Sequence, residues 1–160
     1  MAGSKNNPAH QGGQNNRPPA NRTLIDITIP SDFTASRDVE RQVQAALAAM
    51  HYTPESFFAI KLSLEEALLN AIRHGNREDR SKHVHIRISM TPQRTEIIIE
   101  DQGKGFDRSR VPDPRLDENL EKCTGRGILL IESYMNKVQW TQNGRRLRMV
   151  RKNDHTPPAA

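Results

Sequence analysis

The stretch SLEEALLNAIRHGN, from Ser63 to Asn76, carries the strongest indication of the fold in this chain. Apolar residues recur there at helical spacing, and the predicted core stripe comprises Ile60, Leu64, Ala67, Leu68 and Ala71. Glu66 and Asn70 lie one turn apart beside this stripe, although Asn is a poor helix residue because its amide competes for backbone hydrogen bonds. A carboxylate and an amide at this spacing can present a general base and a magnesium ligand to one cavity. Taken alone, however, the pair fits a solvated helix flank better.

The composition limits the classes of protein that the chain can belong to. Its 160 residues suffice for one hydrophobic core. No apolar run is long enough to span a membrane and no secretory signal precedes the first strand, so we expect neither membrane insertion nor secretion. The single Cys123 excludes an internal disulfide and fits a reducing cytoplasm.

The net charge of +5 raises the question of nucleic-acid binding. Three of these charges, Lys5, Arg17 and Arg22, fall within the first 22 residues, which contain no acidic residue. A second basic cluster at residues 145–152 lacks the interleaved aromatic side chains on which bases would stack. We therefore keep nucleic-acid binding as a minority hypothesis and do not expect it.

The order of the predicted elements indicates one domain of the α+β class. Residues 1–22 are rich in Asn, Gln, Gly and Pro and predict a disordered leader, and residues 153–160 predict a flexible tail. Strands are predicted at 23–30, 82–90, 95–101, 137–142 and 145–151, helices at 34–50, 54–75 and 125–135, and a lid-like loop at 102–124. Thr53-Pro54 predicts the start of the second helix and Gly75 its end, and Asn143-Gly144 predicts a hairpin turn. Alternation along 82–90 predicts one shared face for Val84, Ile86, Ile88 and Met90. This order favours a two-layer sandwich with helices on one face of a mixed or antiparallel sheet. Trp140 is expected in the core or an interface.

Two glycine motifs follow downstream of the opening stretch. Asp101 ends a strand, where its carboxylate could accept a hydrogen bond from an exocyclic amine such as that of adenine, and Gly103 and Gly105 allow close approach of a flat ligand. Gly125 and Gly127 open the third helix, where backbone amides can cradle phosphate. Each motif alone is common, but the three features in this order indicate a nucleotide site without a P-loop.

The segments EALLNAIRHGN, DQGKGFD and GRGILLI stand in the order that is typical of the GHKL, or Bergerat-fold, ATP-binding family. Over residues 23–152 the chain resembles this family, and most of all its stand-alone anti-sigma-factor serine/threonine kinases, which have Glu four residues before Asn. The resemblance implies the histidine kinase-like ATPase fold, on a mixed sheet, for residues 23–152. It also implies that ATP and Mg²⁺ are bound, with Asn70 as the metal ligand and Glu66 as the catalytic base. The residues that it assigns to the nucleotide are Asn70, Asp101, Gly103, Gly105, Gly125, Arg126 and Gly127.

The resemblance further implies a cytoplasmic kinase that phosphorylates an anti-sigma-factor antagonist protein and binds a sigma factor. Related kinases often dimerise, so a homodimer is compatible with it. One departure stands out, because family members usually place Gly-Thr before the last strand and this chain has Asn143-Gly144-Arg145. The departure motivates an alternative hypothesis, a nucleotide-gated regulator that captures its partner without phosphorylating it.

Overall fold

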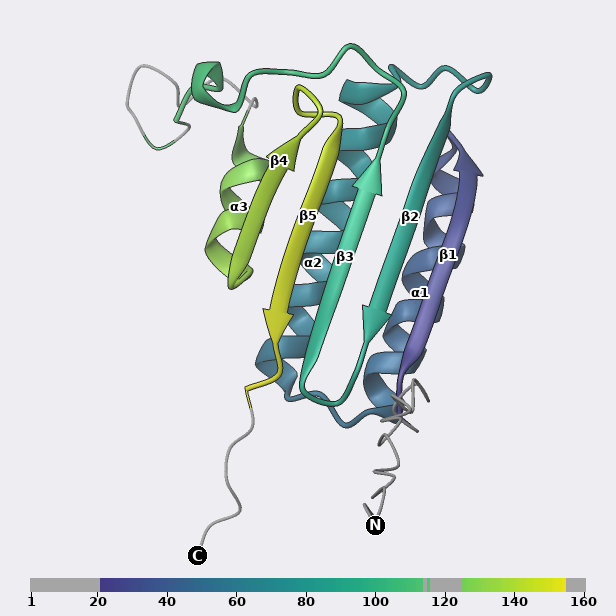
Figure 1. The fold of residues 1–160 in the computed structure, drawn as a ribbon, viewed down its shortest axis with the longest axis vertical. Coiled ribbons are helices and arrows are strands. Elements are labelled where there is room, and N and C mark those ends of the chain that lie inside the picture. Colours follow the sequence, from purple (N-terminus) through teal and green to yellow (C-terminus); the bar gives the residue numbers. More distant parts are fainter. Residues whose placement is uncertain (1–20, 114, 116–124, 155–160) are drawn as a thin grey trace, which may run out of the picture.

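The computed structural model describes residues 21–113, 115 and 125–154. Its strands form a single sheet, which is flanked by helices (Figure 1). The five strands have the order β1-β2-β3-β5-β4, and every neighbouring pair is antiparallel. The mixed sheet that the resemblance implied is therefore wrong for the described strands, because every pair of neighbours runs antiparallel. The strands are β1 (Thr23–Pro30), β2 (His83–Met90), β3 (Arg94–Glu100), β4 (Lys137–Thr141) and β5 (Arg146–Lys152).

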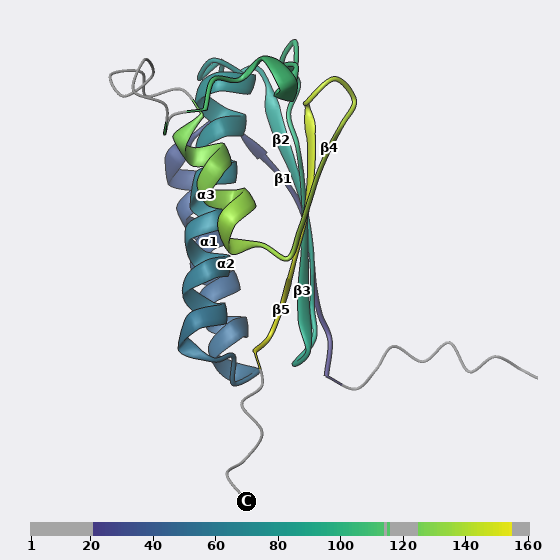
Figure 2. The same cartoon turned by 90° about the vertical axis from the view of Figure 1, so that its left-hand side faces the viewer.

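Within the described residues, the α-helices all cover the same face of the sheet, which gives the predicted two-layer sandwich (Figure 2). They are α1 (Phe33–Ala49), α2 (Pro54–Leu69) and α3 (Arg126–Tyr134), with a π-helical turn at Asn70–Gly75 and a 3-10 turn at Arg108–Arg110. Strand β2 alternates by residue, and its buried members, Val84, Ile86, Ile88 and Met90, meet the helices. The core stripe predicted for α2 is buried throughout.

Local signals explain where the two long helices begin. The Asp32 carboxylate accepts from the Thr34 N–H at 2.8 Å and caps α1. Thr53 caps α2 in the same way, and Pro54 occupies the first helical position, as predicted. None of the helices in the described part of the chain combines the length and apolar character that crossing a bilayer requires.

Three segments that are far apart in sequence meet at the end of the sheet where β3 finishes. They are the π-helical turn after α2, the loop that follows β3, and the hairpin between β4 and β5. The predicted Asn143-Gly144 turn is confirmed, and both residues have positive φ, 56° and 83°. Residues 1–20 of the predicted leader, 155–160 of the predicted tail, and 114 and 116–124 of the predicted lid lie outside the described residues.

Candidate functional site

A cavity of about 260 Å³ opens between the helical layer and this end of the sheet. Six of the eight site residues predicted from the sequence line it, namely Glu66, Asn70, Asp101, Gly105, Gly125 and Gly127. Gly103 and Arg126 do not belong to the lining. Gly103 lies behind Asp101 and donates its N–H to that carboxylate at 2.8 Å, and Arg126 is exposed in the first turn of α3.

Glu66 and Asn70 face this cavity from the end of α2. Burial raises the pKa of the Glu66 carboxyl, and the neighbouring charge of Glu65 raises it further. The Nδ2 atom of Asn70 is buried without a hydrogen-bond partner among the described residues. A buried N–H donor without a partner is costly, so this atom suits a ligand that brings a hydrogen-bond acceptor, whereas a metal would bind the amide oxygen.

The helix predicted at 54–75 extends to Gly75, but it is α-helical only to Leu69 and widens into a π-helical turn at Asn70–Gly75. Its signature is the bond from the Asn76 N–H to the Ala71 carbonyl, five residues back, at 2.8 Å. Such turns are rare and occur frequently at functional sites. Here the turn carries His74 and Gly75 to the cavity wall.

Asp101 lies opposite, at the end of β3, and is half-buried. Its N–H donates to the Arg145 carbonyl at 3.0 Å, which ties the loop to the β4–β5 hairpin. Burial raises the pKa of its carboxyl, while the Gly103 N–H and the charge of Arg145 oppose that rise. A carboxylate in this setting can accept a hydrogen bond from an exocyclic amine of a ligand.

The start of α3 contributes backbone to the same cavity. Gly125 has φ +89° and precedes the first residue of the helix, a conformation that side chains with a Cβ rarely adopt. Gly127 packs directly against Glu66, because a Cβ at this position would overlap Oε2 of that carboxylate. Unsatisfied N–H groups at a helix N-terminus favour anions, so phosphate fits this edge of the cavity.

Two aromatic residues that sequence reasoning did not assign to the site form one wall. Trp140 of β4 and Phe106 meet edge to face, with ring centroids 5.0 Å apart, and both line the cavity. The Nε1 atom of Trp140 is also buried without a partner among the described residues. The signal was available in β4, where alternation from Val138 turns Trp140 towards the helices.

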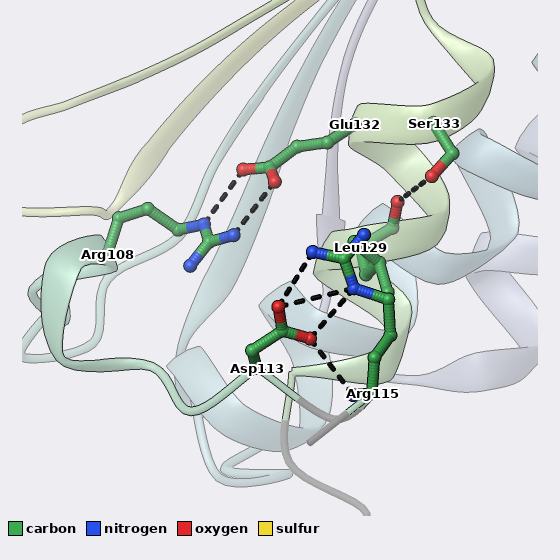
Figure 3. Close-up of polar contacts among 6 residues, drawn as sticks. All are labelled: Arg108, Asp113, Arg115, Leu129, Glu132 and Ser133. Carbon is green, nitrogen blue, oxygen red and sulfur yellow. Dashed lines mark hydrogen bonds and ion pairs between the residues drawn. The ribbon is translucent and has the colours of Figure 1, made fainter.

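The described part of the lid is attached to α3 (Figure 3). The Arg108 guanidinium donates to both oxygens of Glu132, each at 2.8 Å. Further along the loop, Arg115 pairs with Asp113 and lowers the pKa of that carboxyl to about 2. The contact of Arg108 with Glu132 therefore ties the start of the predicted lid to α3.

Comparisons with known proteins agree with this geometry. The model of the histidine kinase-like ATPase domain family matches residues 29–151. The serine-protein kinase RsbW of Bacillus subtilis is 26% identical over 127 residues, which cover 74% of this chain and 78% of the relative. An anti-sigma F factor of Clostridium perfringens is 33% identical over 100 residues, which cover 61% of this chain and 71% of the relative.

A solved structure supports the fold. The RsbU and RsbW domains of Rv1364c from Mycobacterium tuberculosis align with a TM-score of 0.55 and 13% identity, over 82% of this chain and 31% of the other. The family model covers well over half of this chain, and the anti-sigma F factor is matched over more than two thirds of its length. The chain therefore belongs to the histidine kinase-like ATPase domain family and, within it, to the group of the anti-sigma-factor serine kinases.

Proposed function

We propose that this protein is a cytoplasmic serine/threonine-protein kinase that uses ATP and magnesium to phosphorylate an anti-sigma-factor antagonist, and that it also binds a sigma factor. Membership of the family implies the use of ATP, and the names of the relatives support the two protein partners. The single observation that carries the proposal is the pairing of Glu66 and Asn70 across one cavity with Asp101.

Each part of the cavity has a place in this reaction. Asp101 accepts from the adenine amine, the Phe106 and Trp140 rings offer apolar contact to the base, and the α3 N-terminus holds phosphate. Asn70 would hold magnesium through its side-chain oxygen, and the metal would neutralise charge on the phosphates.

Glu66 takes the proton from the hydroxyl of the substrate serine. The serine oxygen bonds to the γ-phosphorus of ATP, and the bond between this phosphorus and the leaving oxygen of ADP breaks. Burial of Glu66 raises the pKa of its carboxyl towards the working pH, which suits a general base. General bases contribute roughly 10²–10⁴-fold to rates. Positioning and charge neutralisation supply the remainder in phosphoryl transfer.

The test combines labelled ATP, magnesium and a candidate antagonist from the same genome. We expect phosphoserine on the antagonist. Glu66→Gln should lower the transfer rate by roughly 10²–10⁴-fold and leave ATP affinity nearly unchanged, because the amide keeps the shape of the side chain and loses the basic oxygen. Asn70→Ala should weaken the magnesium-dependent part of the affinity.

Two results would contradict the proposal in different ways. A wild-type chain that binds ATP but yields no phosphoserine would favour the nucleotide-gated regulator. A wild-type chain that shows no ATP binding by calorimetry would contradict both the kinase and the nucleotide-gated regulator. The homodimer and the sigma-factor complex stay predictions, to be checked by sedimentation and by co-purification with the sigma factor.

A further inference from the structure

The side chain of Asn76 connects three parts of the fold behind the cavity. It follows the π-helical turn, and the residue has no exposed surface. Its Nδ2 donates to the Ser31 hydroxyl at 2.8 Å and to the His83 carbonyl at 2.9 Å, and its Oδ1 accepts from the Gln102 N–H at 2.8 Å. The orientation of the amide is fixed, because a backbone N–H can only donate and a carbonyl can only accept.

The Gln102 N–H belongs to the peptide that joins Gln102 to Asp101. This peptide is held by Asn76, and the Asp101 N–H is held by the Arg145 carbonyl. The Gln102 side chain returns to the same group, since its Oε1 accepts from the His83 N–H at 2.7 Å. The backbone that carries the Asp101 carboxylate is therefore fixed on both sides.

Gly75 supplies the space that Asp101 occupies. A Cβ at this position would lie 2.5 Å from both Cγ and Oδ2 of Asp101, which no real contact allows. The Gly75 carbonyl is also packed so closely against Gly103 that a Cβ on Gly103 would overlap it. The end of the π-helical turn and the loop after β3 thus pack backbone against backbone. Gly103 permits this contact behind the cavity, because it has no side chain.

We propose that Asn76 and Gly75 are positioning residues for Asp101, and that they set the preference of the site for a purine with an exocyclic amine. The proposal rests on the proposed ATP binding and adds to it the residues that aim the recognition carboxylate. A purely structural role predicts something else, since a buried amide that only stabilises the fold would lower affinity for every nucleotide equally.

The discriminating measurement is the ratio of the Kd for inosine triphosphate to the Kd for ATP. Inosine has an oxygen where adenine has its amine, so the base presents an acceptor to the Asp101 carboxylate. A hydrogen bond to a charged group discriminates by roughly tenfold or more, which sets the expected wild-type ratio. Partial unfolding multiplies both constants by the same factor, so it cancels in the ratio.

Three variants complete the design. Asn76→Ala and Gly75→Ala should each reduce the ratio to about threefold or less, the first by releasing the Gln102 peptide and the second by pushing the carboxylate away. Ser31→Ala is the matched control, because it removes a contact of the same amide on the side remote from Asp101. It should lower the Tm and keep the wild-type ratio.

Every outcome bears on the proposal. Unchanged ratios in Asn76→Ala and Gly75→Ala, an equal fall in Ser31→Ala, or a wild-type ratio near one would each overturn it. If Asn76→Ala does not fold, Gly75→Ala decides alone, because it leaves the hydrogen bonds of the amide intact. The affinity of the wild type for ATP separates the proposed function from the positioning role. If the wild type does not bind ATP, the proposed function is overturned. If it binds ATP and the variants keep the wild-type ratio of Kd values, only the positioning role is overturned.

Discussion

Replacing Gly127 by Ala adds one methyl group at a point where the structure has no room for it. The new Cβ would overlap Oε2 of Glu66 and would lie 3.7 Å from Nδ2 of Asn70, so only the carboxylate has to move. Restoring an ordinary van der Waals contact requires a shift of roughly 1 Å. Glu66 can make this shift, because the displaced atom is the far end of a flexible side chain.

We expect Gly127→Ala to lower the rate of phosphoryl transfer and to leave the stability of the fold nearly unchanged. Overpacking a rigid core costs about 1–3 kcal/mol, but here rotation of one side chain relieves the overlap. Ala is also a better helix residue than Gly by up to about 1 kcal/mol, which offsets the remainder. A misplacement of about 1 Å in a catalytic group can cost on the order of 10²-fold. We therefore expect a Tm near that of the wild type and a transfer rate about a hundredfold lower.

The assay is single-turnover transfer from ATP to the antagonist, together with thermal unfolding and calorimetric ATP affinity. A double-mutant cycle with Glu66→Gln identifies the cause. If Gly127→Ala acts by moving the Glu66 carboxylate, it should have almost no further effect once that carboxylate is an amide.

Two results would refute this reasoning. An unchanged rate in Gly127→Ala would show that the position of the Glu66 carboxylate does not limit transfer. A full hundredfold loss in the Glu66→Gln background would show that the methyl group acts elsewhere, for example on the phosphates. A strong loss of ATP affinity in the single variant would point to the same conclusion.

Three further predictions concern the same end of the molecule. Burial raises the pKa of the Glu66 carboxyl, so the folded state binds this proton more tightly than the unfolded chain, and the free energy of unfolding falls as the pH rises through the pKa of the folded state. Glu66→Gln should therefore be more stable than the wild type at neutral pH. Urea unfolding should show that this difference in stability vanishes on acidification. Trp140 is the only Trp, so ATP should change the intrinsic fluorescence with the calorimetric Kd, and a silent titration would place the base elsewhere. The pair of Arg108 and Glu132 is partly exposed, so a double-mutant cycle should give a coupling of about 1 kcal/mol or less that weakens in salt, and a much larger value would contradict this account.

The fold could be predicted because its signals are local. Thr53-Pro54 specifies the start of α2, and Asn143-Gly144 specifies the hairpin turn, through backbone conformations that depend on a few residues. Alternation along β2 identified the buried face in the same way. These three predictions are confirmed, because none depends on a contact with a distant part of the chain.

The missing parts of the site depend on such contacts. The widening of the helix at Asn70–Gly75 could not be predicted, because no propensity scale distinguishes a π-helical turn from a frayed end. Gly75 looked like a helix terminator, whereas the structure gives it a steric role towards Asp101, 26 positions further along the chain. The sequence also could not show that Phe106 reaches the Trp140 ring.

The hairpin explains how the cavity keeps its form without the usual Gly-Thr pair. The Phe106 N–H donates to the Asn143 carbonyl at 2.7 Å, and the Asp101 N–H donates to the Arg145 carbonyl at 3.0 Å. Both contacts are made by backbone atoms, so they do not require a Thr side chain. Gly144, with φ +83°, packs so tightly against Phe106 that any Cβ would collide with it.

The missing Thr therefore removes one hydroxyl and leaves the position of Asp101 unchanged. What replaces the hydroxyl is a cation, because Arg145 lines the cavity and opposes the rise in the pKa of Asp101. The nearby guanidinium favours the ionised form of Asp101, which is the better acceptor for an amine, so the substitution is compatible with the proposed recognition of adenine. The departure from the family pattern thus gives no physical reason to expect loss of ATP binding, and the argument for a regulator without kinase activity loses its main support.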